Sequence, residues 1–282
     1  MDQTAGSLIC RHSPGATVSG SSFYWALRLL PEPRRSAMFQ IYAFCREVDD
    51  IADGSESAEV KMARLEQWRG YVETLFGAGD PDPAITCLKP VVERYRLERA
   101  DLIAIIDGME TDAHAAVRME DEAALDLYLD RVASAVGRLS DRVFGLDGDA
   151  SDQLAHHLGR ALQITNILRD LDEDAARNRL YVPLSLLAAE GVEQGAPGQV
   201  LKHPRIGTVL ETLAARAQRH FGDAAQVLGV LEKAKTRPVR VMMAVYARIL
   251  ERLLSRGLAN THIAVKLGKF EKLWLALRYG VL

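Results

Sequence analysis

Residues 163–174, QITNILRDLDED, combine a helical apolar pattern with a cluster of carboxylates. Four polar side chains recur at offsets of 0, 3, 7 and 11 positions: Gln163, Asn166, Asp170 and Asp174. At about 100° per residue, these offsets place the four side chains within an arc of roughly 80°. Asp172 and Glu173 turn away from this stripe. The stretch therefore predicts an amphipathic helix with an acidic face.

A second acidic stripe lies upstream, in residues 42–53, YAFCREVDDIAD. Its members at offsets 0, 4, 7 and 11 are Tyr42, Arg46, Asp49 and Asp53. Either stripe alone has the ordinary interpretation of a solvated helix face. Two stripes of similar spacing, each with an adjacent arginine, instead favour two helices that face each other across a cleft.

The rest of the chain shows helical apolar patterns and no sustained alternation with a period of two. We expect helices over about 22–30, 34–52, 59–76, 84–96, 98–116, 122–144, 151–172, 208–231, 236–256 and 270–279. Gly145 is a candidate C-terminal cap, and Asp149 or Ser151 can cap the helix that contains residues 163–174. Residues 1–17 are small and polar, which predicts a flexible N-terminus. The prediction is an all-α fold with a single domain over 18–282.

The net charge of -3 gives no argument for binding nucleic acid. The charge is uneven, because residues 202–282 contain 15 Lys+Arg and 5 Asp+Glu, a balance of +10. A basic C-terminal third can cover anionic substrates or face an anionic membrane. Ordinary solvated helix faces are the alternative.

The three cysteines, Cys10, Cys45 and Cys87, have no close spacing, so they indicate neither a zinc site nor a disulfide framework. This suits a reducing cytoplasm. The sequence shows no basic region followed by an apolar run at its start, and no stretch of about 18 consecutive apolar residues. We therefore expect a cytoplasmic protein without a membrane span.

Crowded carboxylates repel one another unless a cation lies between them. Magnesium prefers oxygen ligands and completes its shell with water and substrate phosphate. The candidate ligands are Asp49, Asp53, Asn166, Asp170 and Asp174. The arginines beside both stripes, Arg46, Arg169, Arg177 and Arg179, can hold the remaining phosphate oxygens. With an apolar interior beside it, this pattern points to a lipid-like diphosphate whose departure metal and arginine would assist.

Other site types fit less well. Asp170, Asp172 and Asp174 match positions 1, 3 and 5 of an EF-hand loop. Ala175 replaces the required glycine, however, and Tyr181 replaces the final glutamate. There is no Walker A, G-x-G-x-x-G or H-E-x-x-H motif. Several histidines lack paired ligand spacing and are expected to be structural or surface residues: His114, His156, His157 and His220.

The chain resembles the squalene/phytoene synthase family, the head-to-head trans-isoprenyl diphosphate synthases, over about 20–256. The matching stretches are SFYW (22–25), LLP (29–31), YAFCR (42–46), DDIAD (49–53), IDGME (106–110), Tyr128 with VASAVG (132–137), NILRDLDED (166–174) and NRLY (178–181). The resemblance implies an isoprenoid-synthase-type helical bundle around a central cavity. There two prenyl diphosphates would condense through magnesium-assisted ionisation, attack by the second double bond and cyclopropane closure.

The resemblance also implies residue roles. Tyr128 and the aspartates Asp49, Asp53 and Asp170 would be catalytic, with Tyr128 near the cation. The metal ligands, expected to hold more than one ion, would be Asp49, Asp53, Asn166, Asp170 and Asp174. The substrate contacts would be Ser22, Tyr42, Arg46, Gln163, Arg179 and Tyr181. Two of the tyrosines, Tyr42 and Tyr246, can equally be core residues. Three acidic residues of a further family segment are assigned a helix-end role: Asp107, Glu110 and Asp112.

Within the family, FYW (23–25), REVDDIAD (46–53) and KLWLALRYG (272–280) most resemble the bacterial hopanoid-pathway branch, which forms presqualene diphosphate. This implies farnesyl diphosphate as substrate and no NADPH. Phytoene or dehydrosqualene synthesis, or squalene synthesis with NADPH, are alternatives. Some relatives act as assembly factors with degraded aspartate motifs, and the intact motifs here favour catalysis.

The C-terminal segment combines cationic and apolar residues: Lys266, Lys269, Phe270, Lys272, Leu273, Trp274, Leu277 and Arg278. A basic amphipathic segment can lie on a membrane surface, here the inner face of the membrane. Docking on the protein's own core is the alternative.

Overall fold

The computed structural model describes Leu27 and residues 30–280. The predicted flexible segment 1–17, Ser22 and most of the expected helix 22–30 lie outside the described residues. Within them, the architecture is all-α apart from one very small sheet, which confirms the predicted fold class.

The first half of the described chain contains helices close to the predicted ranges. They are α2 (Arg34–Asp53), α3 (Ala58–Phe76), the 3-10 turn η1 (Thr86–Leu88), α4 (Lys89–Tyr95), α5 (Arg99–Ala113), α6 (Glu122–Leu129), the π-helical turn η2 (Asp130–Ser134) and α7 (Ala135–Phe144). The predicted helix 122–144 therefore exists, but a wider π turn divides it.

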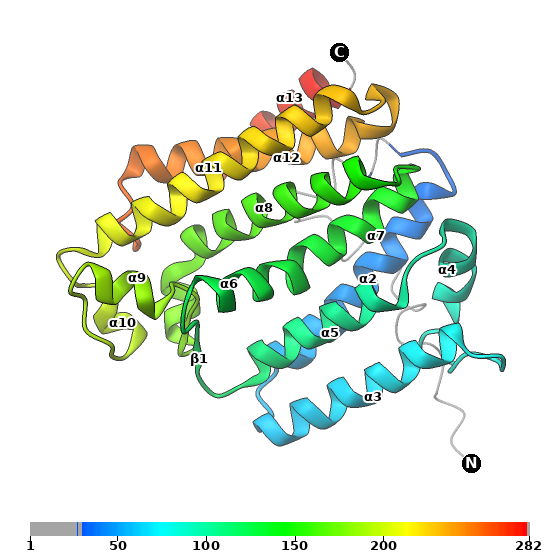
Figure 1. Ribbon diagram of the computed structural model, residues 1–282, viewed down its shortest axis with the longest axis horizontal. Helices are drawn as coiled ribbons and strands as arrows, with labels where there is room; N and C mark the ends of the chain where they lie inside the picture. Colours follow the sequence, from blue (N-terminus) through cyan, green and yellow to red (C-terminus); the bar gives the residue numbers. More distant parts are fainter. Residues whose placement is uncertain (1–26, 28–29, 281–282) are drawn as a thin grey trace.

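The second half is built around the longest helix. It comprises α8 (Asp149–Ala176), α9 (Leu184–Ala189), α10 (Pro197–Val200), α11 (Ile206–Val230), α12 (Lys233–Arg256) and α13 (Lys269–Gly280). In Figure 1, α8 lies between α11 on one side and the line of α6 and α7 on the other, while α2, α5 and α3 follow below. This arrangement buries α8 along most of its length.

The apolar positions of the 163–174 stretch are buried as expected: Ile164, Ile167, Leu168 and Leu171. The stripe residues Gln163, Asn166, Asp170 and Asp174 are only half-buried, whereas Asp172 and Glu173 are exposed. The period of 3.6 residues thus separates a face that packs from a face that lines a site.

Two turns show where local prediction succeeded and failed. Gly145 caps α7 with φ of 81°, a left-handed conformation that glycine adopts without strain, as predicted. The predicted side-chain cap of α8 is wrong, because the helix begins after Gly148 with no side-chain cap bond. The Ser151 hydroxyl instead donates to the Asp141 carboxylate at 3.4 Å.

Glycine also sets the contact between α8 and η2. A Cβ at Gly159 would lie 2.8 Å from the backbone nitrogen of Ser134, closer than real Cβ atoms approach. The main chains of the two elements therefore touch directly at this crossing.

Two strands of two residues each, β1 (Val117–Arg118) and β2 (Arg179–Leu180), form a parallel pair, with Val117 opposite Arg179. Strands this short leave no periodic signal, so the sequence did not predict them. Their pairing holds the segment that follows α8 against the segment that follows α5.

Cys45 is a free thiol, whereas Cys87 is disulfide-bonded, a pairing that the cysteine spacing did not indicate. Among the described residues, no helix is long and apolar enough to cross a bilayer.

Candidate active site

The acidic face of α2 is organised by Arg46. Its guanidinium nitrogens lie 2.7 Å from Asp49 Oδ2 and 2.7 Å from Asp50 Oδ1. These are neighbours one helical turn away, as the spacing predicted. Tyr42, one turn before Arg46, is half-buried.

Asp53, the last residue of α2, binds two arginines of the segment that follows α8. Arg179 Nη1 donates to Asp53 Oδ1 at 2.7 Å, and Arg177 Nη1 donates to Asp53 Oδ2 at 2.5 Å. Burial would raise the pKa of Asp53, but the hydrogen bonds from the two arginines outweigh burial and lower it. The first aspartate motif, residues 49–53 at the end of α2, is therefore in direct contact with the segment after α8.

On α8, the second aspartate motif, residues 166–174, offers both amide and carboxylate oxygen atoms. Asn166 Nδ2 donates to Gln163 Oε1 at 3.2 Å, while the buried Asn166 Oδ1 has no hydrogen-bond partner. Asp170 accepts two hydrogen bonds from Arg169, at 2.8 and 2.6 Å. An unpartnered buried oxygen is costly unless a ligand satisfies it.

Carboxylate crowding spans both motifs. Burial, and then the charge of Asp53, raise the pKa of Asp49 to about 6. Burial, and then the charge of Asp170, raise the pKa of Asp174 to about 7. Asp112 on α5 raises both of these pKa values further. Magnesium fits this donor set, because it would relieve the repulsion and could satisfy the free oxygen of Asn166.

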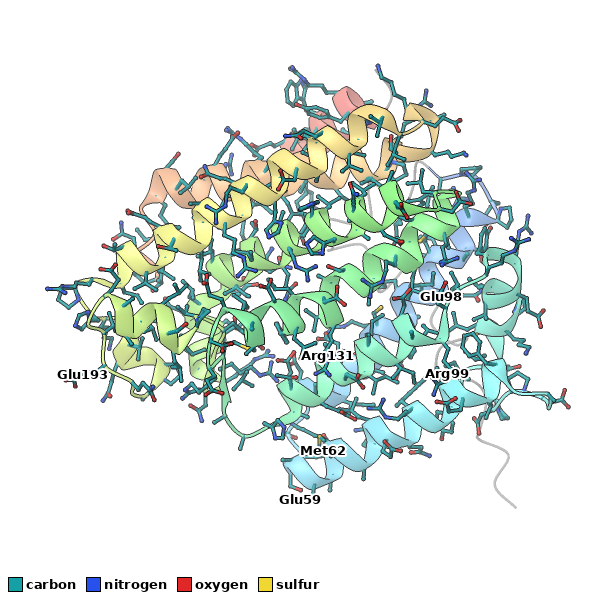
Figure 2. All side chains as sticks on the ribbon, viewed as in Figure 1. Glu59, Met62, Glu98, Arg99, Arg131 and Glu193 are labelled. Atoms are coloured by element: carbon teal, nitrogen blue, oxygen red, sulfur yellow. The ribbon has the colours of Figure 1, made fainter. Side chains whose placement is uncertain are left out.

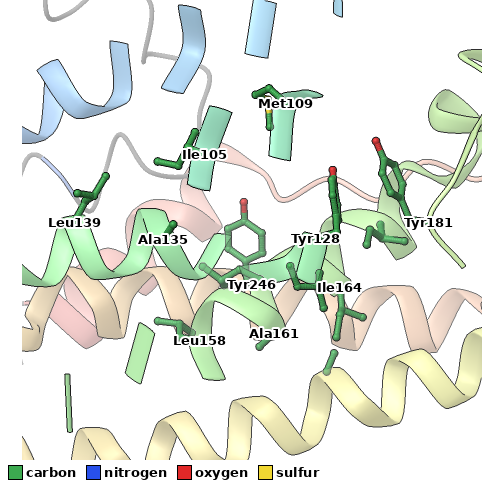
Figure 3. Packing of buried hydrophobic residues seen from close by; sticks show 14 of the residues in the cluster. Ile105, Met109, Tyr128, Ala135, Leu139, Leu158, Ala161, Ile164, Tyr181 and Tyr246 are labelled. Atoms are coloured by element: carbon green, nitrogen blue, oxygen red, sulfur yellow. The ribbon is translucent and has the colours of Figure 1, made fainter. Parts of the chain in front are cut away.

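Asp112 has a place in the site that the sequence did not reveal. Its carboxylate accepts hydrogen bonds from Tyr181 at 2.6 Å and from Tyr128 at 3.0 Å, and the two rings stack with centroids 4.9 Å apart. Figure 3 shows both hydroxyls pointing to the same side. Asp112 is buried, so the assigned helix-end role is wrong. The available signal was its place three positions after buried Met109, on an apolar helix face.

The other two acidic residues of this segment have a structural role instead. Arg69 on α3 lies 2.8 Å from Asp107 and 2.6 Å from Glu110. Arg131 on η2, which is labelled in Figure 2, approaches Asp107 at 3.7 Å. These ion pairs join α3 and η2 to the middle of α5, so the helix-end assignment is wrong here as well.

An apolar cavity of about 220 Å³ extends from the second motif between η2, α7, α8 and α12. Its polar end is formed by Gln163, Asn166 and Tyr246. Small residues line its walls: Ala133, Gly137, Ala155 and Gly159. Leu154 lines the cavity twelve positions before Asn166, so the cavity follows α8 for about 18 Å. A long, thin apolar chain with a polar head matches this shape.

The far end of the cavity contains an unexpected acid. Phe144 and Leu154 line this end, together with Asp141, which is 3 % exposed. Burial raises the pKa of Asp141 to about 8, so its carboxyl is largely protonated at neutral pH. A neutral carboxyl keeps the cavity free of charge at this end.

Of the predicted site residues, Ser22 lies outside the described residues. Gln163 and Asn166 line the polar end of the cavity, and Tyr128, Tyr181 and Arg179 contact Asp112. Asp49 and Asp174 lie close enough to Asp112 for its charge to raise their pKa values. Arg179 is 8 % exposed and also donates to the Asp112 backbone carbonyl at 2.8 Å. One arginine, which follows the second aspartate motif in the chain, therefore contacts both the first aspartate motif and the residue that binds the tyrosine pair.

The chain is similar to characterised enzymes along nearly its full length. Presqualene diphosphate synthase of Rhodopseudomonas palustris is 47% identical over 262 residues, which cover 93% of this chain and 94% of that protein. The enzyme of the same name from Zymomonas mobilis is 44% identical, with coverages of 94% and 92%. Phytoene synthase 1 of Arabidopsis thaliana is 31% identical over 89% of this chain and 61% of that protein.

Solved structures share the fold. A dehydrosqualene synthase superposes with a TM-score of 0.76 at 23% identity, covering 93% of this chain and 91% of that one. Squalene synthase of Alicyclobacillus acidocaldarius superposes with a TM-score of 0.74 at 24% identity, with coverages of 83% and 88%. The squalene/phytoene synthase model matches residues 16–271. The chain belongs to the squalene/phytoene synthase family.

Proposed function

We propose that this protein is a prenyltransferase that condenses two farnesyl diphosphates head-to-head into presqualene diphosphate. The observations that carry the proposal are an elongated apolar cavity whose polar end is lined by Asn166 of the second aspartate motif, and the ion pair that joins Asp53 of the first motif to Arg179. The relatives at 44% and 47% identity that bear the name presqualene diphosphate synthase support it. Residues 18–282 would form one catalytic domain, which we place in the cytoplasm.

The proposed ligands for more than one magnesium ion are Asp49, Asp53, Asn166, Asp170 and Asp174. Magnesium, when bound, would neutralise diphosphate charge and make it a better leaving group. Arg46, Arg179, Tyr181 and Gln163 would contact the diphosphate oxygens, with Tyr42 as a further substrate contact.

The apolar walls would hold the prenyl chains and keep water from an allylic cation. Loss of diphosphate from one molecule would be followed by attack of the double bond of the second. Loss of a proton would then close the cyclopropane. Tyr128 and Tyr181, both hydrogen-bonded to Asp112, would stabilise positive charge or accept this proton while passing the hydroxyl proton to the Asp112 carboxylate.

The deciding experiment incubates purified protein and magnesium with farnesyl or geranylgeranyl diphosphate, with and without NADPH, and identifies products by mass spectrometry. We expect presqualene diphosphate from farnesyl diphosphate, unchanged by NADPH. A C40 product from geranylgeranyl diphosphate alone would favour phytoene synthesis. Squalene formed only with NADPH would favour squalene synthesis.

We further propose that α13 touches an anionic membrane surface. Leu275 and Ala276 are buried, so the face of α13 that carries them packs on the protein core. The opposite face bears four apolar side chains at helical spacing: Phe270 (89% exposed), Leu273 (39%), Trp274 (53%) and Leu277 (52%). Lys269 and Arg278 accompany them, and this combination favours a bilayer interface.

Co-sedimentation of the full chain with anionic and zwitterionic liposomes tests this contact. We expect binding to anionic liposomes that is lost in a Phe270→Ser/Trp274→Ser double variant. Val230→Ser is the matched control, because Val230 is 80% exposed on a different helix. Equal binding by the wild type and the double variant would refute the contact.

A further inference from the structure

Three histidines that show no ligand spacing in the sequence meet in space on the far side of α8 from the cavity. His156 and His157 lie on α8, and His220 lies on α11. One ring nitrogen from each lies within 4.8 Å of the others. His157 is nine positions before Asn166, so it points about half a turn away from the cavity face. The prediction that these histidines are structural or surface residues gave no sign that three of them lie together.

The geometry is close to that of a metal centre. His157 Nδ1 and His220 Nδ1 are 3.1 Å apart, and the His156 ring lies 4.8 Å from the His157 ring between centroids. Zinc–nitrogen bonds of 2.0–2.1 Å in a tetrahedral site place ligand atoms about 3.4 Å apart. Because His156 is exposed, a small side-chain rotation would bring its nitrogen to that distance.

A carboxylate supports the cluster. Asp223 Oδ2 lies 3.6 Å from His157 Nδ1, and Asp223 is on α11, three positions after His220. Carboxylates commonly coordinate or orient metal-binding imidazoles. On the other side, Arg160 pairs with Asp126 at 3.5 Å and Asp130 at 3.5 Å, so its positive charge is largely balanced.

The imidazoles are also in a suitable protonation state. Burial, and then the neighbouring His157, lower the pKa of His220 to about 4. Burial, and then Arg160, lower the pKa of His156. Neutral imidazoles offer a lone pair, and this ligand type suits zinc, copper or nickel rather than magnesium.

We propose that His156, His157 and His220 form a transition-metal site, with Asp223 as its carboxylate, that links α8 to α11. The site is separate from the carboxylate motifs that are proposed to bind magnesium. A metal there would stabilise the folded state by binding it in preference to the unfolded chain. It would fix α11 against the side of α8 that faces away from the cavity. Because α8 carries the second aspartate motif, the metal would also stabilise the position of that motif.

The test uses full-length, tag-free protein treated with chelator and then kept in excess magnesium, so that the carboxylate motifs are occupied. Calorimetry measures zinc binding, and visible absorption measures cobalt binding. We expect one equivalent of zinc, a higher melting temperature with zinc, and the absorption of tetrahedral cobalt. His157→Ala and His220→Ala should each weaken zinc binding about tenfold or more.

His114→Ala and His262→Ala are the matched controls, because neither residue belongs to the cluster. Circular dichroism confirms folding, and the exposed His156→Ala variant gives the same test with little risk to packing. Turnover should be unchanged in all of these variants without zinc. Absence of zinc and cobalt binding by the wild type, or equal binding by the cluster variants, overturns the proposal.

Discussion

Arg179 donates to Asp53 at 2.7 Å although 126 positions separate the two residues in the chain. The same guanidinium also reaches the backbone carbonyls of Ala52 at 3.2 Å and Asp112 at 2.8 Å. One side chain therefore fastens the end of α2 and the end of α5 to the segment that follows α8. This cross-link sets the spacing between the two aspartate motifs.

Arg179→Lys should impair the enzyme, because an ammonium group does not reproduce the planar, multi-directional contacts of a guanidinium. A hydrogen bond to a charged group contributes about 1.5–3 kcal/mol, so we expect KM for the prenyl diphosphate to rise roughly tenfold or more. Steady-state kinetics and a thermal melt measure both effects. Arg177→Lys is the control, since its side chain is 42% exposed against 9% for Arg179, and its effect should be smaller.

Asp49→Asn should weaken magnesium activation, because this half-buried carboxylate is a proposed ligand. We expect the magnesium concentration for half-maximal rate to rise, and kcat/KM to fall by about 100-fold or more. Asp50→Asn is the neighbouring control, since Asp50 is exposed and contacts Arg46. Similar losses in both variants would point to a general effect of helix charge instead of metal binding.

Tyr128→Phe should lower kcat with little change in stability, because it removes only the hydroxyl bonded to Asp112. Proton transfer by a positioned group typically contributes about 10²–10⁴-fold, and we expect a loss near the lower limit because Tyr181 remains. Asp112→Asn should lower both kcat and the melting temperature, since it replaces a buried acceptor of two hydroxyls. Full activity in both variants would remove the tyrosine pair from the mechanism.

Phe144→Ala should lengthen the cavity at its far end and change chain-length selectivity. Phe144 lines the end opposite Asn166, so its truncation opens space where a longer prenyl chain would extend. We expect the ratio of turnover with geranylgeranyl to farnesyl diphosphate to rise. Core truncation of this kind costs about 3–5 kcal/mol, so the assay belongs well below the melting temperature. An unchanged ratio in folded protein would exclude Phe144 as the limit.

Asp141→Asn should stabilise the protein at alkaline pH and not at acidic pH. The pKa of Asp141 is raised from 3.8 to about 8, so between these values the folded chain holds a proton that the unfolded chain releases. The free energy of unfolding contributed by this group therefore falls as pH rises from about 4 to about 8. Denaturant melts at pH 4 and pH 8 measure the difference. An equal effect of Asp141→Asn on the free energy of unfolding at both pH values would contradict this assignment.

Most of the helical architecture could be predicted because it follows from local periodicity. The polar stripes on α2 and α8 are visible in the sequence for the same reason, since each is contained in one helix. The contacts between elements are different. The link from Arg179 to Asp53 depends on a two-residue strand pair, which has too few residues to show a pattern.

The residues missed in the sequence are those whose role arises only from packing. Asp112 resembles a surface acid until Tyr128 and Tyr181 are placed against it. His156, His157 and His220 have unremarkable spacing until α11 packs on α8. Asp141 likewise acquires its raised pKa from burial beneath neighbouring helices, which no local pattern reports.

The main-chain contact at Gly159 affects which substitutions near the site can be tolerated. Because α8 touches η2 through backbone atoms there, the alignment of Asn166 with Tyr128 does not depend on which side chains surround the crossing. Substitutions around it can accumulate without misaligning the two halves of the site. A methyl group at Gly159 itself would act as a wedge between the helix of the carboxylates and the helix of the tyrosine.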